Sequence, residues 1–91
     1  MTQDANPDQD AQYLEEVIEL MVATELELEA KGYPEKLTRN AVERARGIAE
    51  YKTSEVRPSL RTVVFRDIIE GELRMAEVWA ARQQSYFDTE G

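Results

Sequence analysis

Cationic side chains gather in the middle of this 91-residue chain, where their chemistry suits an anionic group. Arginine binds carboxylate and phosphate bidentately through its planar guanidinium. The set comprises Arg39, Arg44, Arg46, Lys52, Arg57, Arg61 and Arg66. Two interpretations are open. The set either binds an anionic metabolite or an acidic partner, or it pairs with glutamates of the first predicted helix.

Carboxylates form a second constellation, in pairs four residues apart at Glu15 and Glu19 and at Glu25 and Glu29. Helical bundles that bind metals through carboxylates combine inward glutamates with Glu-x-x-His pairs. The chain has no histidine, and these glutamates flank an apolar stripe instead of lying within it. We therefore expect a solvated acidic face, no metal and no cofactor.

Histidine and cysteine are both absent, which removes the usual general base, the thiolate nucleophile and the commonest metal ligands. The four glycines are too far apart to form a phosphate-binding loop. An enzyme would have to work with carboxylates, arginine, lysine and tyrosine alone. The sequence thus predicts a protein that is not an enzyme and has no catalytic residues.

Apolar residues recur every three or four positions in three segments, which predicts three helices. Gly32 is a good stop for the first helix, and Pro34 and Pro58 suit the first turns of the next two. The predicted segments are 11–31, 34–52 and 58–87. The short connections favour an all-α, three-helix antiparallel arrangement within one domain, 11–87. Residues 1–10 read as a disordered acidic tail, and 88–91 as a frayed end.

The first helix carries more apolar residues than one face needs. Its predicted inward stripe is Leu14, Val17, Met21, Thr24 and Leu28, with Ile18 beside it. Leu20, Val22 and Leu26 fall off that stripe. The helix is therefore either buried on two sides or offers a second apolar face to another chain. The second helix has a stripe of smaller residues, namely Leu37, Ala41 or Val42, Ala45, and Ile48 or Ala49.

The third predicted helix is the longest and has the only tryptophan. Its predicted stripe is Leu60, Val63, Val64, Ile68, Met75, Val78, Trp79 and Tyr86, widened by Phe65, Ile69 and Leu73. Gly71 predicts a kink or a close helix contact. At 1.5 Å per residue this helix is roughly 45 Å long, against roughly 28 Å for the second. About ten residues must then overhang or bend back, and a homodimer or a larger protein would cover them.

The residues predicted to bind this partner lie mainly at the overhang. Trp79, Tyr86 and Phe87 are the expected apolar anchors, because aromatic residues and arginine are favoured at interfaces. The expected polar rim contacts are Arg44, Arg46 and Arg82.

Charge is distributed unevenly: residues 1–35 carry a net −9, residues 36–66 a net +5 and residues 67–91 a net −4. Acidic and basic helices can neutralise one another within the bundle, or the basic middle can meet an acidic partner. The overall charge of −8 argues against direct nucleic-acid binding, which depends on positive surface. No apolar run of about 18 residues predicts a membrane span. The polar N-terminus and the absence of cysteine favour a cytoplasmic protein.

The central region contains Arg44-Ala45-Arg46, Thr62-Val63-Val64, Arg66-Asp67-Ile68 and Glu70-Gly71. These segments resemble two helices of the omega subunit of bacterial RNA polymerase, although the Asn-Arg-Phe segment of that family is missing here. The resemblance implies a small subunit that clamps a polymerase. Residues 46–52 and 65–69 are also similar to the helical chorismate mutase fold. The acidic first helix departs from that family's arginine- and lysine-bearing helix, so its activity is not carried over.

Together these patterns predict a small acidic helical module for protein–protein interaction, acting as a regulator, inhibitor, adaptor or accessory subunit. The alternative is a helical enzyme or binder that uses the arginine set on an anionic metabolite. A third hypothesis is nucleic-acid mimicry, with the acidic first helix occupying a basic cleft.

Overall fold

The computed structural model describes the backbone of residues 7–90 and the side chains of residues 9–86. Its four helices are α1 (Pro7–Ala30), α2 (Glu35–Thr53), α3 (Pro58–Arg74) and α4 (Ala76–Glu90). No strand occurs in the described part of the chain, and the predicted all-α class is confirmed. Helical structure covers 7–10 and 88–90, which were predicted as tail and frayed end, whereas residues 1–6 and 91 lie outside the described ranges.

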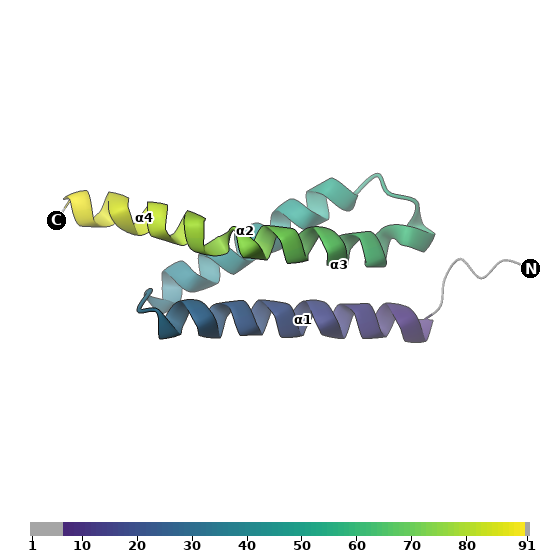
Figure 1. Cartoon of the computed structure of the whole chain (residues 1–91). Helices are drawn as coiled ribbons and strands as arrows, with labels where there is room; N and C mark the ends of the chain where they lie inside the picture. The colour runs from purple at the N-terminus through teal and green to yellow at the C-terminus, as the bar shows by residue number, and fades with distance from the viewer. Residues whose placement is uncertain (1–6, 91) are drawn as a thin grey trace, which may run out of the picture.

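The helices pack as an elongated bundle (Figure 1). α1 runs in the same direction as α3 and α4, and α2 crosses behind them in the opposite direction. α2 packs against both α3 and α4, while α1 packs against α2 and α3. The end of α4 extends beyond the ends of α1 and α2 (Figure 1). One long side of α1 has none of the other described helices against it (Figure 1).

Gly32 ends α1 through its backbone geometry, as the sequence predicts. Its φ is +99°, the left-handed region that glycine enters without steric cost. The amide of Gly32 donates to the carbonyl of Glu29 at 3.0 Å, and the amide of Tyr33 donates to the carbonyl of Leu28 at 3.1 Å. This pair of hydrogen bonds is the Schellman motif. Tyr33 also packs on the cluster that contains Leu28, which is the apolar contact that accompanies this motif.

The long third helix is interrupted at Met75 and not at Gly71. α3 runs through Gly71 unbroken, and a Cβ added there would meet nothing within 4 Å. The predicted kink or close contact at Gly71 is therefore wrong. At Met75 the amide donates to the carbonyl of Glu72 at 3.0 Å, and ψ opens to −3°. One turn is thus tightened, and α4 continues onward from α3 with a changed direction.

The core consists of two clusters on either side of this interruption. The first joins α1, α2 and α3 and contains Val17, Val42, Ala45, Ala49, Ile69 and Leu73. The second joins the end of α1, the start of α2 and the start of α4, and contains Leu28, Leu37, Ala41, Ala76 and Ala80. Full burial of Ile69, which has no exposed surface, stabilises the fold by roughly 1.5–3 kcal/mol.

The small-residue stripe predicted on the second helix is confirmed, since Leu37, Ala41, Val42, Ala45 and Ala49 are all buried. The stripe predicted on the third helix is only partly correct. Leu60, Met75, Val78 and Tyr86 are exposed, and the positions expected to widen the stripe, Ile69 and Leu73, form its centre instead. Periodicity identified the apolar positions of this helix but not the direction in which its neighbours lie.

Candidate interaction surface

Four large aliphatic side chains lie exposed in a line along α1. They occupy every fourth position, at Leu14, Ile18, Val22 and Leu26, and their exposed fractions are 48%, 60%, 48% and 61%. We call this set the α1 outer row. Residues four apart on a helix form a continuous ridge, and helix packing inserts such ridges into the grooves of a neighbour. The outer row therefore has the geometry of a helix-packing surface, and none of the described helices packs on it.

The inward face of α1 holds the row in place. Val17 and Leu28 are buried, and Leu20 and Met21 pack against the first cluster. Because these residues fix the rotation of α1, the row must point outward. Of the two alternatives for this helix, burial on two sides or a second apolar face, the described structure shows a second apolar face that is exposed. Leu14, predicted to point inward, belongs to this exposed row instead.

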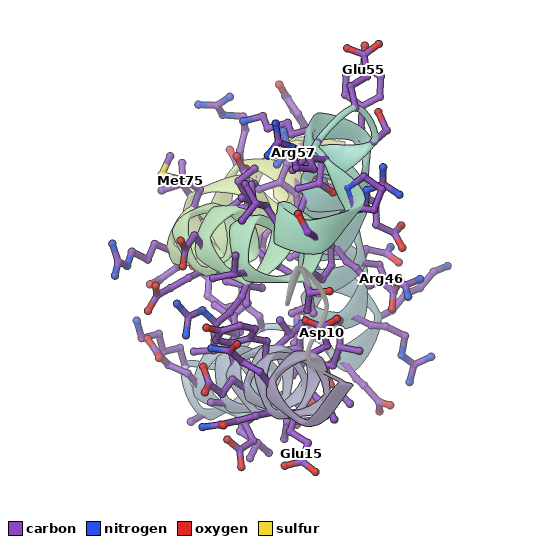
Figure 2. The ribbon with its side chains drawn as sticks, turned by 90° about the vertical axis from the view of Figure 1, so that its right-hand side faces the viewer. Asp10, Glu15, Arg46, Glu55, Arg57 and Met75 are labelled. Carbon is purple, nitrogen blue, oxygen red and sulfur yellow. The ribbon has the colours of Figure 1, made fainter. Side chains whose placement is uncertain are left out.

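Carboxylates flank the row along its whole length. Glu15, Glu19, Glu25 and Glu29 form no ion pair within the described part of the chain. α1 itself contains no lysine or arginine. Figure 2 shows Glu15 pointing away from the body of the bundle, on the side of α1 farthest from the other helices. The exposed apolar row is therefore flanked within α1 by carboxylates that form no ion pair with a described residue.

Arg66 ties α1 to α3. Its guanidinium donates to Glu16 at 2.8 Å and to Asp67 at 2.9 Å, and it lies 4.8 Å from the centre of the Tyr13 ring. The hydrogen bond to Glu16, followed by that to Asp67, raises the pKa of Arg66 above its ordinary value. Arg66 was predicted as part of an anion-binding set, and the structure shows it engaged with two carboxylates of its own chain.

Lys31 makes the corresponding link at the other end of α1. Its ammonium lies 2.7 Å from a carboxylate oxygen of Glu77 at the start of α4 and 3.3 Å from one of Glu27. These contacts, with the hydrogen bond to Glu77 the strongest, raise the pKa of Lys31 above 10.5. Arg66 and Lys31 thus pair with Glu16 and Glu27 of α1. The glutamates that flank the outer row form no ion pair with a described residue.

A shallow groove follows the junction of α1 with α3 and α4. It consists of two depressions of about 330 and 570 Å³, which share Leu20 and Glu70 in their lining. Its charged lining consists of Glu16, Glu19, Glu27, Glu70 and Glu77 together with Arg66 and Arg74. Carboxylates are thus in excess there, but the groove is not purely acidic. Sequence reasoning did not find it, because its walls come from segments about 50 positions apart.

Trp79, predicted as an apolar anchor for a partner, is partly buried within its own chain. It is half-buried against the second cluster, and the guanidinium carbon of Arg44 lies 5.9 Å from the centre of its ring. The structure therefore brings together the predicted anchor Trp79 and the predicted rim residue Arg44. Their contact joins α4 to α2 and does not lie on the overhanging end.

The remaining predicted partner-binding residues do not converge on one place. Tyr86 is 59% exposed near the overhanging end of α4, and the side chain of Phe87 lies outside the described residues. Arg82 is exposed on α4, whereas Arg46 extends from α2 and pairs with Glu43 at 3.1 Å. Figure 2 shows Arg46 and Met75 on opposite sides of the bundle.

The central cations other than Arg66 mostly have partners outside α1. Lys52 lies 3.0 Å from Glu72 of α3, and Arg39 lies 2.7 Å from Glu35 within α2. Arg61 donates to the carbonyl oxygen of Val56 at 2.8 Å and so closes the turn between α2 and α3. The ion pairs of α2 are thus made within α2 and with α3. Among the described residues, Arg66 alone of the central set makes the pairing with the first helix that the charge pattern suggested.

Comparison with known proteins leaves the class of this protein open. No family model matches the chain, and neither the curated proteins nor the solved structures include a significant match. Among the residues that the structure describes, no group of histidine, cysteine, aspartate or glutamate side chains is placed to hold a metal ion. None of the described helices is both long enough and apolar enough to span a bilayer.

Proposed function

We propose that this chain is a small acidic helical module for protein–protein interaction, serving as a regulator, inhibitor, adaptor or accessory subunit. The observation that supports this most is the α1 outer row. Four aliphatic residues in register on one exposed ridge are costly to leave in water, at about 25 cal/mol for each Å² of apolar surface. Contiguous apolar surface with a polar border is typical of binding sites, whereas single exposed apolar residues need no explanation.

A second surface runs over α3 and α4. Leu60, Met75 and Val78 are each about half exposed there, and Tyr86 lies near the overhanging end of α4. A homodimer formed through this surface is the alternative to a different partner. Sedimentation equilibrium at micromolar concentration distinguishes the two, because a mass equal to one chain excludes the homodimer.

The interaction function is tested by capture with matched surface variants. The tagged protein and two double variants, Ile18→Ser with Leu26→Ser and Leu60→Ser with Val78→Ser, are used as baits in lysate of the native host. We expect a protein that the unaltered chain captures and that one double variant loses by about tenfold, equivalent to about 1.4 kcal/mol. The purified partner must then bind the purified chain. Capture that neither variant changes would overturn the proposal.

A further inference from the structure

The outer row is long enough to accept a helix. Its first and last residues, Leu14 and Leu26, are twelve positions apart, which corresponds to about 18 Å at 1.5 Å per residue. A partner helix of three to four turns would cover that length. Its residues would lie in the grooves on either side of the ridge, as in other helix–helix contacts.

The row alone is too small for a stable interface, so its charged border must take part. A specific interface of standard size buries about 800 Å² on each partner, or 20–30 residues. Four half-exposed aliphatic residues supply only the centre of such an area. The rim must therefore include the glutamates at 15, 19, 25 and 29, none of which forms an ion pair within residues 9–86.

This rim argues against a second copy of the chain as the occupant. A two-fold dimer brings the same patch of both subunits together, so each acidic flank would face acidic residues of the other copy. Such like-charge contacts are unfavourable and would weaken the binding of a second copy at this row. The basic face of α2 in a second copy would not cover the outer row either. The exposed residues near Arg39 and Arg46 include no aliphatic row that could pack on α1.

We infer that the α1 outer row binds a cationic amphipathic helix of another protein. The aliphatic side chains of that helix cover Leu14, Ile18, Val22 and Leu26, and its lysine or arginine residues meet the flanking glutamates. This inference rests on the proposed interaction function and adds the surface and the chemistry of the partner. Arg66 and Lys31 hold α1 to α3 and α4 from its other side, so the helix presents the row on a supported element.

The probe for this inference is a synthetic helical peptide with leucines four apart and lysines on both flanks. Two control peptides have the same leucines with glutamates on the flanks, and the same composition in scrambled order. Binding to the full chain is measured by fluorescence anisotropy, and the contact surface by NMR chemical-shift changes. We expect only the patterned cationic peptide to bind, with shift changes concentrated in α1.

Matched variants separate shape from charge. Ile18→Ser with Leu26→Ser should weaken binding by about tenfold or more, whereas Leu60→Ser with Val78→Ser, at exposed aliphatic positions on α3 and α4, should change it by less than about twofold. The combined substitutions Glu15→Gln, Glu19→Gln, Glu25→Gln and Glu29→Gln should weaken binding and reduce its salt dependence. The control set on α2 and its following turn, Glu35→Gln, Glu43→Gln, Glu50→Gln and Glu55→Gln, changes the net charge equally and should have a smaller effect.

Several outcomes would overturn the inference. Equal binding of the scrambled peptide, or equal effects of the two double variants, would show unspecific charge attraction. Loss of binding on charge neutralisation without any effect of the row variant would favour mimicry of nucleic acid by α1. A dimer in sedimentation that the row variant dissociates would show that a second copy covers the row. If lysate capture depends on residues 60 and 78 alone, the proposed function stands and this inference fails.

Discussion

The guanidinium carbon of Arg44 lies 5.9 Å from the centre of the Trp79 ring, so a cation–π contact joins α2 to α4. Both residues were predicted to face a partner, and both also contribute to the bundle. Trp79 also packs on the second cluster, where the alanines at 76 and 80 provide only methyl groups. The indole is consequently the largest apolar group that α4 places against the rest of the protein.

Arg44→Ala should lower the free energy of unfolding by about 0.5–1 kcal/mol, the usual value of an exposed cation–π contact. Because Trp79 is the only tryptophan, its fluorescence during denaturation reports this region directly. Arg46→Ala is the matched control, since that arginine pairs only with Glu43 of the same helix. Equal losses for the two variants would show that the Trp79 contact contributes nothing specific.

Gly71→Ala should raise the free energy of unfolding by about 1 kcal/mol. Gly71 lies in the interior of α3 with open space around it, and alanine is the better helix former. Gly32→Ala should have the opposite effect and cost about 1–2 kcal/mol, because a side chain disfavours its left-handed conformation. Thermal melts followed by circular dichroism measure both. Stabilisation at position 32, or destabilisation at 71, would contradict the helix boundaries described above.

Thr38→Val should stabilise the protein or leave it unchanged. Thr38 is fully buried, and its hydroxyl has no hydrogen-bond partner among the described residues, a condition that costs about 1–3 kcal/mol. Thr53→Val is the control, since Thr53 is also buried and its hydroxyl donates to the carbonyl of Ala49 at 2.8 Å. We expect opposite signs in chemical denaturation, and a loss of more than about 1 kcal/mol for Thr38→Val would contradict this account.

The Lys31 contacts predict a stability change at high pH. The pKa of Lys31 is raised in the folded protein by Glu77 and Glu27, so its stabilising contribution is complete below about pH 10.5 and is lost as the pH rises through the folded value. The difference in melting temperature between the protein and Lys31→Gln should therefore be constant up to about pH 10 and shrink above it. Lys36→Gln, at an exposed lysine with no ion pair among the described residues, should show no such trend.

Sequence reasoning found the helices because their ends are encoded locally. Gly32 supplies the left-handed residue that stops α1, and Pro58 occupies the first position of α3. The interruption at Met75 was not foreseeable in the same way, because methionine is a good helix former and Gly71 is a poor one. The position of the break follows the change from one core cluster to the other, which depends on contacts with α1 and α2.

The candidate surface was only partly predictable. The surplus of apolar residues on α1 signalled two apolar faces, and Val22 and Leu26 were correctly set apart from the inward stripe. Leu14 and Leu20 were assigned to the opposite faces, since their periodicity fits either rotation of the helix. The packing of α3 against Val17 and Leu20 decides that rotation, and no pattern within α1 reports it. The partner-binding roles of Trp79, Tyr86 and Phe87 remain a prediction.

The division of the core also sets how the molecule comes apart. α4 is held mainly through Trp79 and two alanines, whereas α3 contributes Ile69 and Leu73 to the other cluster. Regions with few buried apolar contacts open at lower free energy than the whole protein. Backbone amides of α4 should therefore exchange with deuterium well before those around Ile69. A binding partner that covers α4 would slow exchange in that helix without altering exchange in the rest of the bundle. Binding at α4 would therefore be detected as a local rise in protection.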